Sequence, residues 1–325
     1  MKEVNIGFIG CGMVSELHYQ ALKHVAGAKL AAIYDVVPEV REQRSREWGV
    51  PAYSDLHELL RADGLDAVFV LSPVIHHYEQ AVLALSYGKH VLVEKPVSAT
   101  VLEAREMERL AALRGLVCMP AHNYIYLPEM ARLKRSLEEG KLGVVPVSWF
   151  LYHVHHPKHI AAGYPGIVRQ IGTHLLYAHR YLFGPPAHLT AAASRFLYPE
   201  LCRDDQVMLS LTMPDGSLAN LFASFAVNDA SSNPWSFVVK VLGTEGSAQI
   251  SWQDIVYERP IGTLGRSFGS YEESYEHEIR HFVDACIRNG APPLSTMSDA
   301  AEVMLLVELA ESQFRPAGER GGRQI

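Results

Sequence analysis

Hydrophobic residues in the first third of the chain gather into short runs and do not alternate with polar residues. Each run is rich in Val, Ile, Leu or Ala. A strand that is covered on both faces has this composition, because neither face meets water. The pattern predicts strands at Val4–Ile9, Lys29–Tyr34, Ala67–Leu71, His90–Val93 and Leu116–Met119.

Helix-sized segments separate these strands, and several carry end signals. Pro38 suits a first helical turn, Asp55 suits an N-cap, and Gly88 follows a helical segment as a C-terminal glycine would. Strand and helix in alternation predict a doubly wound parallel sheet. The predicted helices are Met13–Val25, Pro38–Trp48, Asp55–Arg61, His76–Tyr87 and Thr100–Arg114.

From residue 123 onward the order of elements changes, because strands follow one another without helices between them. Such succession predicts an antiparallel sheet, and Pro214-Asp215-Gly216 is a hairpin turn signal. The tail from Pro316 is expected to be loose or to contact a partner. The predicted elements are a helix at Pro128–Glu139, a strand-like run at Val144–His155, strands at Leu189–Ala193, Val207–Met213, Leu218–Ala226, Phe237–Gly243 and Ala248–Ser251, and helices at Glu272–Arg288 and Ser298–Gln313.

Composition narrows the class of protein. The chain has 325 residues, 48% hydrophobic and 20% charged, which suits a globular protein of two domains. A formal charge of −7 without a long Lys/Arg run argues against a nucleic-acid partner. No apolar stretch approaches the roughly 18–20 residues that cross a bilayer. Four scattered cysteines and a start that enters a strand directly favour a cytoplasmic location.

A glycine turn follows the first predicted strand and opens a helix. Gly10 permits the tight turn, and Gly12 lets a pyrophosphate approach the free N–H groups of the helix N-terminus. Ser15 stands where a third glycine is usual, and it is small enough for close helix packing. The strand–turn–helix context makes the fingerprint of a Rossmann domain meaningful here.

An acidic residue completes this fingerprint. Asp35 lies at the end of the second strand, where a carboxylate accepts hydrogen bonds from the adenosine ribose. Val36 and Val37 follow it, with no Arg to receive a 2′-phosphate, so NAD is expected and NADP is disfavoured. A glycine turn with a capping Asp and no ligand is the alternative, and the register of strand, turn, helix and acid argues against it.

Polar groups follow several of the predicted strands: Ser72-Pro73, Glu94-Lys95-Pro96 and His122-Asn123. In an open parallel sheet, ligands bind at this edge. An amine at Lys95, next to a positively charged nicotinamide ring, would shift toward its neutral form and take part in proton transfer. Without other evidence, a lysine paired with Glu94 would be the simpler interpretation.

These motifs together resemble a known family. Gly10-x-Gly12, Ser72-Pro73-x-x-His76, the run from Gly88 to Pro96 that ends in Glu-Lys-Pro, and Gly243-Thr-Glu-Gly246 are similar to those of the glucose–fructose oxidoreductase / inositol dehydrogenase / rhizopine catabolism (Gfo/Idh/MocA) family. The likeness covers nearly the whole chain, and its Glu-Lys-Pro block is specific.

The resemblance implies a Rossmann domain over residues 1–122 and, over residues 123–325, an α+β domain with a large open, mostly antiparallel sheet that binds substrate and makes homodimer or homotetramer contacts. It implies sugar or polyol substrates and places Lys95 beside nicotinamide and substrate, with Glu94 and Pro96 shaping the cofactor pocket. The expected cofactor-binding set is Gly10, Gly12, Met13, Val14, Asp35, Ser72, Pro73, His76, Glu94, Lys95 and Pro96.

The family's second catalytic element is an Asp-x-x-x-His pair on a helix, and here the chain reads Gln170-Ile-Gly-Thr-His174. The buried stripe of this helix is expected at Ile167, Ile171, Leu175, Ala178 and Leu182. The register match makes His174 the candidate acid/base, in preference to a half-buried structural histidine. Gln170 can bond a substrate hydroxyl but carries no charge, so either it is a binding group or activity is altered. Ile125, where many relatives carry Arg, disfavours an anionic substrate.

A histidine-rich run, Tyr152-His153-Val-His155-His156, invites a metal interpretation. No Cys or suitably spaced carboxylate completes a ligand set, so no metal is expected. Imidazoles that line a polar substrate wall are favoured, because sugars are held by directional hydrogen bonds. The substrate-binding candidates are Gln170, Asn123, Tyr124, Tyr152, His153 and His155.

The resulting hypothesis is an NAD-dependent oxidoreductase that oxidises a hydroxyl, or reduces a keto group, of a sugar, sugar derivative or cyclic polyol, with Lys95 and His174 as acid/base groups. Two alternatives stay open. One is an NAD-binding regulatory sensor without net turnover, which Gln170 and Ile125 motivate. The other is an NAD-dependent glycoside-cleaving enzyme that works through transient oxidation.

Overall fold

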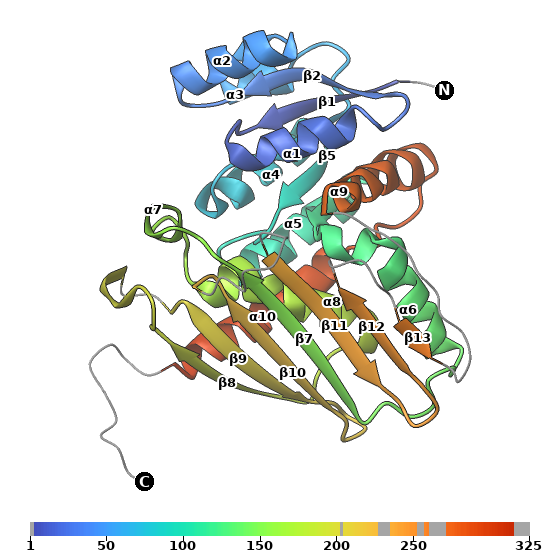
Figure 1. Cartoon of the computed structure of the whole chain (residues 1–325). Helices are drawn as coiled ribbons and strands as arrows, with labels where there is room; N and C mark the ends of the chain where they lie inside the picture. Colours follow the sequence, from blue (N-terminus) through green and yellow to red (C-terminus); the bar gives the residue numbers. More distant parts are fainter. Residues whose placement is uncertain (1–2, 202–203, 227–234, 252–256, 260–270, 315–325) are drawn as a thin grey trace. The chain divides into compact units, whose positions relative to one another are not determined.

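The computed structural model describes residues 3–201, 204–226, 235–251, 257–259 and 271–314 (Figure 1). The described residues form two compact units. The first comprises residues up to 128 together with 271–304, and the second comprises those between 129 and 259 together with 305–314. The predicted tail from Pro316 lies outside the described residues.

A parallel sheet is the centre of the first unit. Its strand order is β3-β2-β1-β4-β5-β6, and every neighbouring pair is parallel, so the predicted doubly wound Rossmann sheet is confirmed. Residues of β1, β4 and β5 are almost all buried, which explains their continuous hydrophobic runs. The strands are β1 (Val4–Ile9), β2 (Ala28–Tyr34), β3 (Ala52–Tyr53), β4 (Ala67–Val70), β5 (His90–Glu94) and β6 (Cys118–Ala121).

Helices of this unit begin at the residues that the capping signals indicate. The side chain of Asp55 accepts hydrogen bonds from the backbone N–H groups of His57 and Glu58, and Thr100 and Glu103 form a reciprocal capping box. The helices are α1 (Met13–Leu22), α2 (Pro38–Trp48), α3 (Leu56–Leu60), α4 (His77–Ser86) and α5 (Val101–Arg114), with single turns at η1 (Val74–His76) and η2 (Asn123–Tyr126).

Residues far along the chain complete the first unit. Helix α9 (Tyr271–Arg280) lies beside α1 in Figure 1, and the Tyr275 and His18 rings meet edge to face at 4.9 Å. The π-helical segment η5 (His281–Arg288) continues α9 and packs Phe282 against Phe69. The predicted helix at Glu272–Arg288 is present, in two helical forms. Helix α10 (Met297–Ser312) follows and contributes to both units.

The second unit contains a mixed sheet in the order β13-β12-β11-β7-β10-β9-β8. Among the described strands of this second sheet, only β7 and β10 pair in parallel, so the mostly antiparallel prediction is confirmed. The predicted turn at Asp215-Gly216 joins β9 to β10. Its elements are α6 (Pro128–Glu138), β7 (Val147–Val154), α7 (Lys158–Ala161), η3 (Val168–Gly172), α8 (Thr173–Phe183), β8 (His188–Ser194), η4 (Pro199–Leu201), β9 (Gln206–Thr212), β10 (Leu218–Ser224), β11 (Trp235–Leu242), β12 (Ser247–Ser251) and β13 (Tyr257–Arg259).

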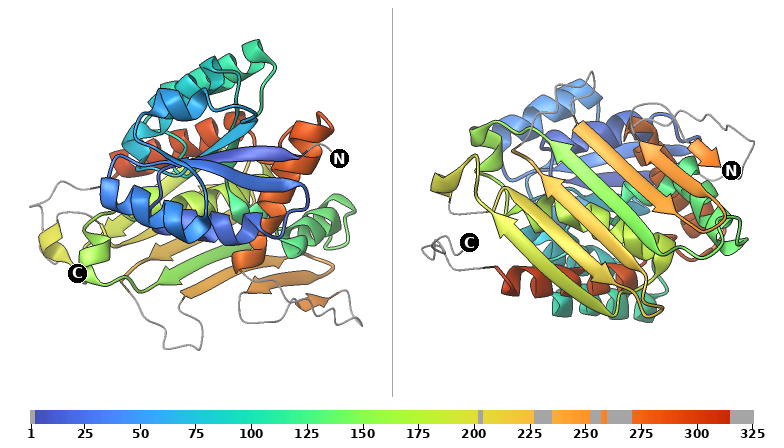
Figure 2. Two further views of the ribbon diagram at one scale, coloured as in Figure 1. Left: turned by 90° about the horizontal axis from the view of Figure 1, so that it is seen from above. Right: turned by 60° about the horizontal axis from the view of Figure 1, so that its bottom comes forward.

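Alternation along these strands separates the two faces of the sheet. One face carries buried side chains such as Phe150, Leu221 and Val239, and α8 and η3 cover it. The other face, toward the viewer in the right-hand view of Figure 2, presents Trp149 and Met208, which are 39% and 49% exposed. Within the described part of the chain, no helix is long and apolar enough to cross a membrane.

Candidate active site

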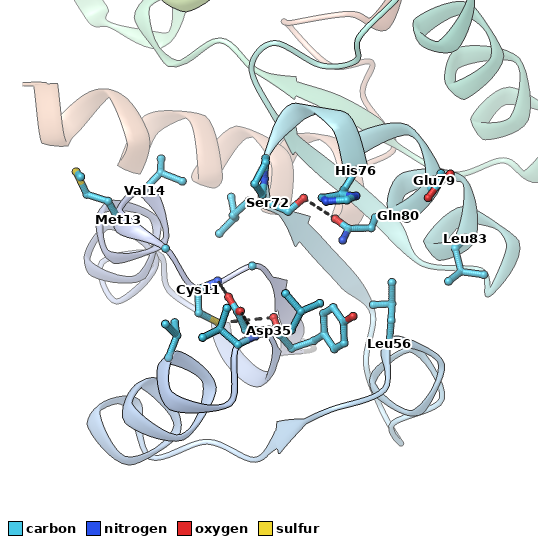
Figure 3. Close-up of a pocket in the computed structure, with 18 residues that line it drawn as sticks. Cys11, Met13, Val14, Asp35, Leu56, Ser72, His76, Glu79, Gln80 and Leu83 are labelled. Atoms are coloured by element: carbon cyan, nitrogen blue, oxygen red, sulfur yellow. Dashed lines mark hydrogen bonds between the residues drawn. The ribbon is translucent and has the colours of Figure 1, made fainter. Parts of the chain in front are cut away.

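A cavity of about 690 Å³ opens at the carboxyl ends of β1, β2 and β4, in the first unit (Figure 3). This position is where the strand order of a doubly wound sheet reverses, and a ligand crevice is expected there. The cavity is lined by Gly10, Cys11, Gly12, Met13, Val14, Tyr34, Asp35, Val36, Val37, Val40, Leu56, Leu71, Ser72, Pro73, His76, Glu79, Gln80 and Leu83.

Both the backbone conformation of Gly10 and the space around it exclude a side chain. Its φ is +94°, and a Cβ at this position would lie 2.8 Å from the backbone nitrogen of Ser72. The turn therefore brings the first crossover close to the end of β4, as the glycine fingerprint requires. A Cβ at Gly12 would meet no atom of the described residues within 4 Å, so the space beside this end of α1 is open to a ligand.

The N-terminus of α1 is suited to an anion. Gly12 is the N-cap, and no side chain of the described residues caps the helix, so the first N–H groups of α1 have no helical acceptor. These groups and the helix dipole favour a negatively charged ligand such as a pyrophosphate. Ser15 is fully buried and its hydroxyl donates to the carbonyl of Gly12, which keeps the turn packed against the helix.

Asp35 is held against the glycine turn. Its Oδ2 accepts a hydrogen bond from the backbone nitrogen of Cys11 at 2.7 Å, and its Oδ1 accepts one from Val37 at 2.9 Å (Figure 3). Burial and the charge of Asp35 raise the pKa of the Cys11 thiol to about 12, so this cysteine is an unreactive thiol. The carboxylate is thus fixed in place beside the cavity, with lone pairs left for ligand hydroxyls.

Glu94 and Lys95 lie at the end of β5. Glu94 is buried, and its two oxygens accept hydrogen bonds from His18 Nε2 at 3.0 Å and from the backbone nitrogen of Lys95 at 2.9 Å. Burial raises the pKa of Glu94, but the hydrogen bond and charge of His18, together with the charge and backbone N–H of Lys95, outweigh burial and lower this pKa. Burial also lowers the pKa of the Lys95 amine, which brings it toward the neutral form that a base requires.

Two buried histidines, His122 and His77, lie near this strand end, and of these the sequence analysis named only His122, as a polar residue after a strand. Burial and the charge of Lys95 lower the pKa of His122 to about 3. His77 is buried and bonded at both ring nitrogens, whereas the predicted His76 is exposed and lines the cavity. A chain cannot reveal which of two adjacent histidines turns inward at the start of a helix, and this explains the omission.

His174 lies in the second unit, on α8. It is buried, and its ring lies 5.8 Å from the ring of Tyr152 on β7. Gln170 belongs to the π-helical segment η3 that leads into α8. A π-helical turn of this kind is often found at functional sites. The stripe predicted for this helix, from Ile167 to Leu182, is buried throughout.

The predicted histidine wall does not form one surface with Tyr152. His153 alternates with Tyr152 along β7, and its ring meets Phe222 of β10 on the opposite face of the sheet, at 5.1 Å. His155 follows the strand and is exposed. In the part of the chain that the structure describes, no group of His, Cys, Asp and Glu side chains has metal-binding geometry.

Asn123 and Tyr124, also predicted to bind substrate, are buried in the first unit. The amide of Asn123 donates to the hydroxyl of Ser274 at 2.7 Å, and the ring of Tyr124 lies 6.0 Å from that of Tyr271. These contacts join η2 to α9. A role of these two residues in substrate binding stays a prediction, as do the roles of Lys95 and His174.

Comparison with known proteins identifies the family. The family model described as "Oxidoreductase family, NAD-binding Rossmann fold" (GFO_IDH_MocA) matches residues 4–122, and the GFO/IDH/MocA C-terminal domain model matches residues 130–249. The chain belongs to the GFO/IDH/MocA family. It is therefore an oxidoreductase with an NAD-binding Rossmann domain.

Individual members of the GFO/IDH/MocA family match along almost the whole chain. D-apiose dehydrogenase of Paraburkholderia graminis is 26% identical over 95% of this chain and 87% of its own length. scyllo-Inositol 2-dehydrogenase (NAD(+)) of Bacillus subtilis is 26% identical over 96% of this chain and 94% of its own. Among solved structures, levoglucosan dehydrogenase in complex with NADH and L-sorbose is 20% identical with a TM-score of 0.86, covering 96% and 97% of the two chains, and this likeness supports the fold.

Proposed function

We propose that this GFO/IDH/MocA protein oxidises a hydroxyl of a sugar, sugar derivative or cyclic polyol with NAD, or reduces the corresponding ketone. The observation that carries the proposal is the cavity beside the glycine turn, where an uncapped helix N-terminus and the fixed carboxylate of Asp35 meet. The residues present fit a dinucleotide. The turn and α1 suit its pyrophosphate, and Asp35 suits an adenosine ribose.

When bound, NAD supplies the hydride acceptor. The protein has to take the proton that leaves the same hydroxyl, and Lys95 is the proposed group because burial lowers its pKa. His174 is the proposed acid/base partner from the second unit, with Tyr152 beside it and Gln170 as a neutral hydrogen-bonding group. The dehydrogenases of D-apiose and scyllo-inositol among the relatives support an uncharged polyhydroxy substrate.

The test is NADH formation across a panel of pentoses, hexoses and inositols, with wild type and Lys95→Ala. Lys95→Ala is expected to lose turnover by at least about 100-fold and to keep its NAD dissociation constant within about threefold, since the turn and Asp35 are unchanged. Lys23→Ala, an exposed lysine on the same unit, serves as the control and is expected to behave as wild type. Full turnover in Lys95→Ala would remove Lys95 from the chemistry.

A regulatory sensor is the second candidate function, because Gln170 replaces the carboxylate expected before His174. A tightly held dinucleotide without turnover on any member of the panel would favour the sensor. Release of a sugar from a glycoside without accumulation of NADH would favour cleavage through transient oxidation. Gln170→Asp separates these outcomes further, since it restores the charge beside His174 and is expected to raise turnover only in a redox enzyme.

We also propose that the protein is a homodimer or homotetramer through the sheet of the second unit. Apolar Trp149, Met208 and Leu218 are exposed on the sheet face opposite α8, which no described helix covers, and such a face suits a second copy of the chain. Trp149→Lys is expected to lower the molar mass measured by light scattering. Leu102→Lys, at an exposed position on α5, is the control. A monomeric wild type would contradict this proposal.

A further inference from the structure

His77, the first residue of α4, connects two loops at the edge of the Rossmann sheet. Its Nε2 lies 2.6 Å from the carbonyl oxygen of Ser72, and its Nδ1 lies 2.8 Å from the carbonyl oxygen of Pro96. Ser72 comes after β4 and lines the cavity, while Pro96 follows Lys95 at the end of β5. One buried ring therefore bridges the loop at Ser72, which lines the cavity, and the loop at Pro96, which follows the proposed base Lys95.

The two carbonyl oxygens require a side chain that places one nitrogen toward each of them, and an imidazole ring has two such nitrogens. A carbonyl oxygen only accepts, so a neutral imidazole donates to one of the two loops and an imidazolium donates to both. Burial lowers the pKa of His77, and both carbonyls together with Glu94 of β5 act against this shift, while neighbouring His76 adds to it. The ring is 1% exposed, so water does not replace either contact.

The position of Lys95 depends on the loop that His77 holds. Glu94 fixes the backbone nitrogen of Lys95 on one side, and the contact from His77 to Pro96 fixes the residue on the other. Ser72, at the other end of the bridge, is further fixed by the hydrogen bond from its hydroxyl to Gln80 at 2.6 Å. These contacts hold the loop of Lys95 in place against the wall of the cavity as well as against its own strand.

We propose that His77 is a positioning residue that holds the Lys95 loop at a set place relative to a dinucleotide bound at Gly10 and Asp35. The inference rests on the proposed function, because it assigns His77 to the alignment of the base in that reaction. The reaction is sensitive to such alignment, since a shift of about 1 Å between reacting groups costs about 100-fold in rate. NAD affinity depends mainly on the turn and Asp35 and changes less.

The first measurement compares His77→Ala and His77→Gln with wild type by steady-state kinetics and NAD titration. His77→Ala is expected to lower kcat about 100-fold with the NAD dissociation constant within about threefold, and His77→Gln, which retains one donor, to fall between Ala and wild type. His24→Ala, an exposed histidine of the same unit, is the control. Folding of each variant is checked by thermal unfolding, and His77→Gln carries the test if the Ala variant does not fold.

The second measurement reads the environment of Lys95. Because burial lowers the pKa of Lys95, a loosened loop exposes the amine and moves the rising limb of kcat/KM to higher pH in His77→Ala and not in His24→Ala. The same midpoint is followed without turnover, from the pH dependence of amine labelling at Lys95 by mass spectrometry. A wild-type kcat and an unmoved midpoint in a folded His77→Ala would overturn the inference while the function stands. A wild type without turnover removes the proposed function, and the labelling midpoint still decides the role of His77.

Discussion

The carboxylate of Asp35 accepts a hydrogen bond from the backbone nitrogen of Cys11 at 2.7 Å, and so the end of β2 is tied to the glycine turn that follows β1. Asp35→Asn keeps the shape of the side chain and removes its charge. NAD affinity is expected to fall about 10-fold, since hydrogen bonds to a charged group contribute about 1.5–3 kcal/mol. NADP affinity is expected to fall less or to rise, because a 2′-phosphate is repelled by the carboxylate and not by the amide.

Fluorescence titration with both cofactors checks this prediction. Asp63→Asn, an exposed acid in the same unit, is the control and should leave both affinities unchanged. An equal loss of affinity for NAD and NADP would show that Asp35 acts through the turn alone and not on the ribose.

Gly10 and Gly12 are predicted to respond differently to the same substitution. Gly10→Ala places a Cβ 2.8 Å from the backbone of Ser72 at a φ of +94°, so both the melting temperature and NAD binding should fall. Gly12→Ala meets open space at a φ of −71°, so the melting temperature should stay within a few degrees while NAD binding falls, because the new methyl stands where phosphate approaches. Thermal unfolding with and without NAD separates the two effects, and an unchanged NAD affinity in Gly12→Ala would contradict the phosphate assignment.

Glu278 of α9 is a buried acid near Glu94, and neither of its oxygens has a hydrogen-bond partner among the described residues. Burial and the charge of Glu94 raise the pKa of Glu278 well above 4.5. The folded state therefore binds a proton that the unfolded chain releases, and stability is lost as pH rises above about 4.5 toward the raised pKa. Glu278→Gln resembles the protonated acid and should be more stable than wild type in mildly alkaline buffer.

Urea unfolding at mildly acidic and mildly alkaline pH tests this expectation. The advantage of Glu278→Gln should grow with pH, and Glu272→Gln at an exposed position of the same helix should show no such trend. An advantage that is independent of pH would mean that Glu278 is already ionised in the folded protein.

His179 of α8 makes stability depend on pH in the opposite direction to Glu278, because its pKa is lowered in the folded state. It is buried between Phe150 and Phe183, and burial lowers its pKa to about 4 from 6.5. The unfolded chain binds the proton first, so the stability that neutral His179 permits is lost as pH falls from about 6.5 toward 4. His179→Leu removes this titration, and the acid-induced loss of unfolding free energy should shrink by about 3 kcal/mol. Urea unfolding at neutral and acidic pH measures the difference, and an identical acid loss in the variant would contradict the assignment.

The sequence predicts most of the fold because local signals and burial agree. The runs that became β1, β4 and β5 are apolar throughout, and Asp55 and Thr100 stand at real helix starts. Strand β3 escapes such analysis, because Ala52–Tyr53 is too short for any periodicity. The return of α9 to the first unit also escapes it, because nothing in the helix itself says which sheet it will join.

In the candidate site as well, the sequence predicted some features and missed others. The glycine turn, Asp35 and Ser72 line one cavity, as their places at strand ends suggested. The inward turn of His77 and the splitting of Tyr152 from His153 depend on tertiary packing and on strand phase, which the run of aromatic and histidine residues does not reveal. Whether Lys95 and His174 act together stays a prediction for the kinetic experiments above.

The late return of residues 271–304 to the first unit has a consequence for biosynthesis. The face of α1 that carries His18 receives Tyr275 from α9 only after the ribosome has made the whole second sheet. Until then the nascent Rossmann segment exposes an apolar surface, because Phe282 is not yet present to pack against Phe69. A truncated gene that stops after the sixth strand should therefore yield an aggregating polypeptide, and the nucleotide-binding half matures last although it is translated first.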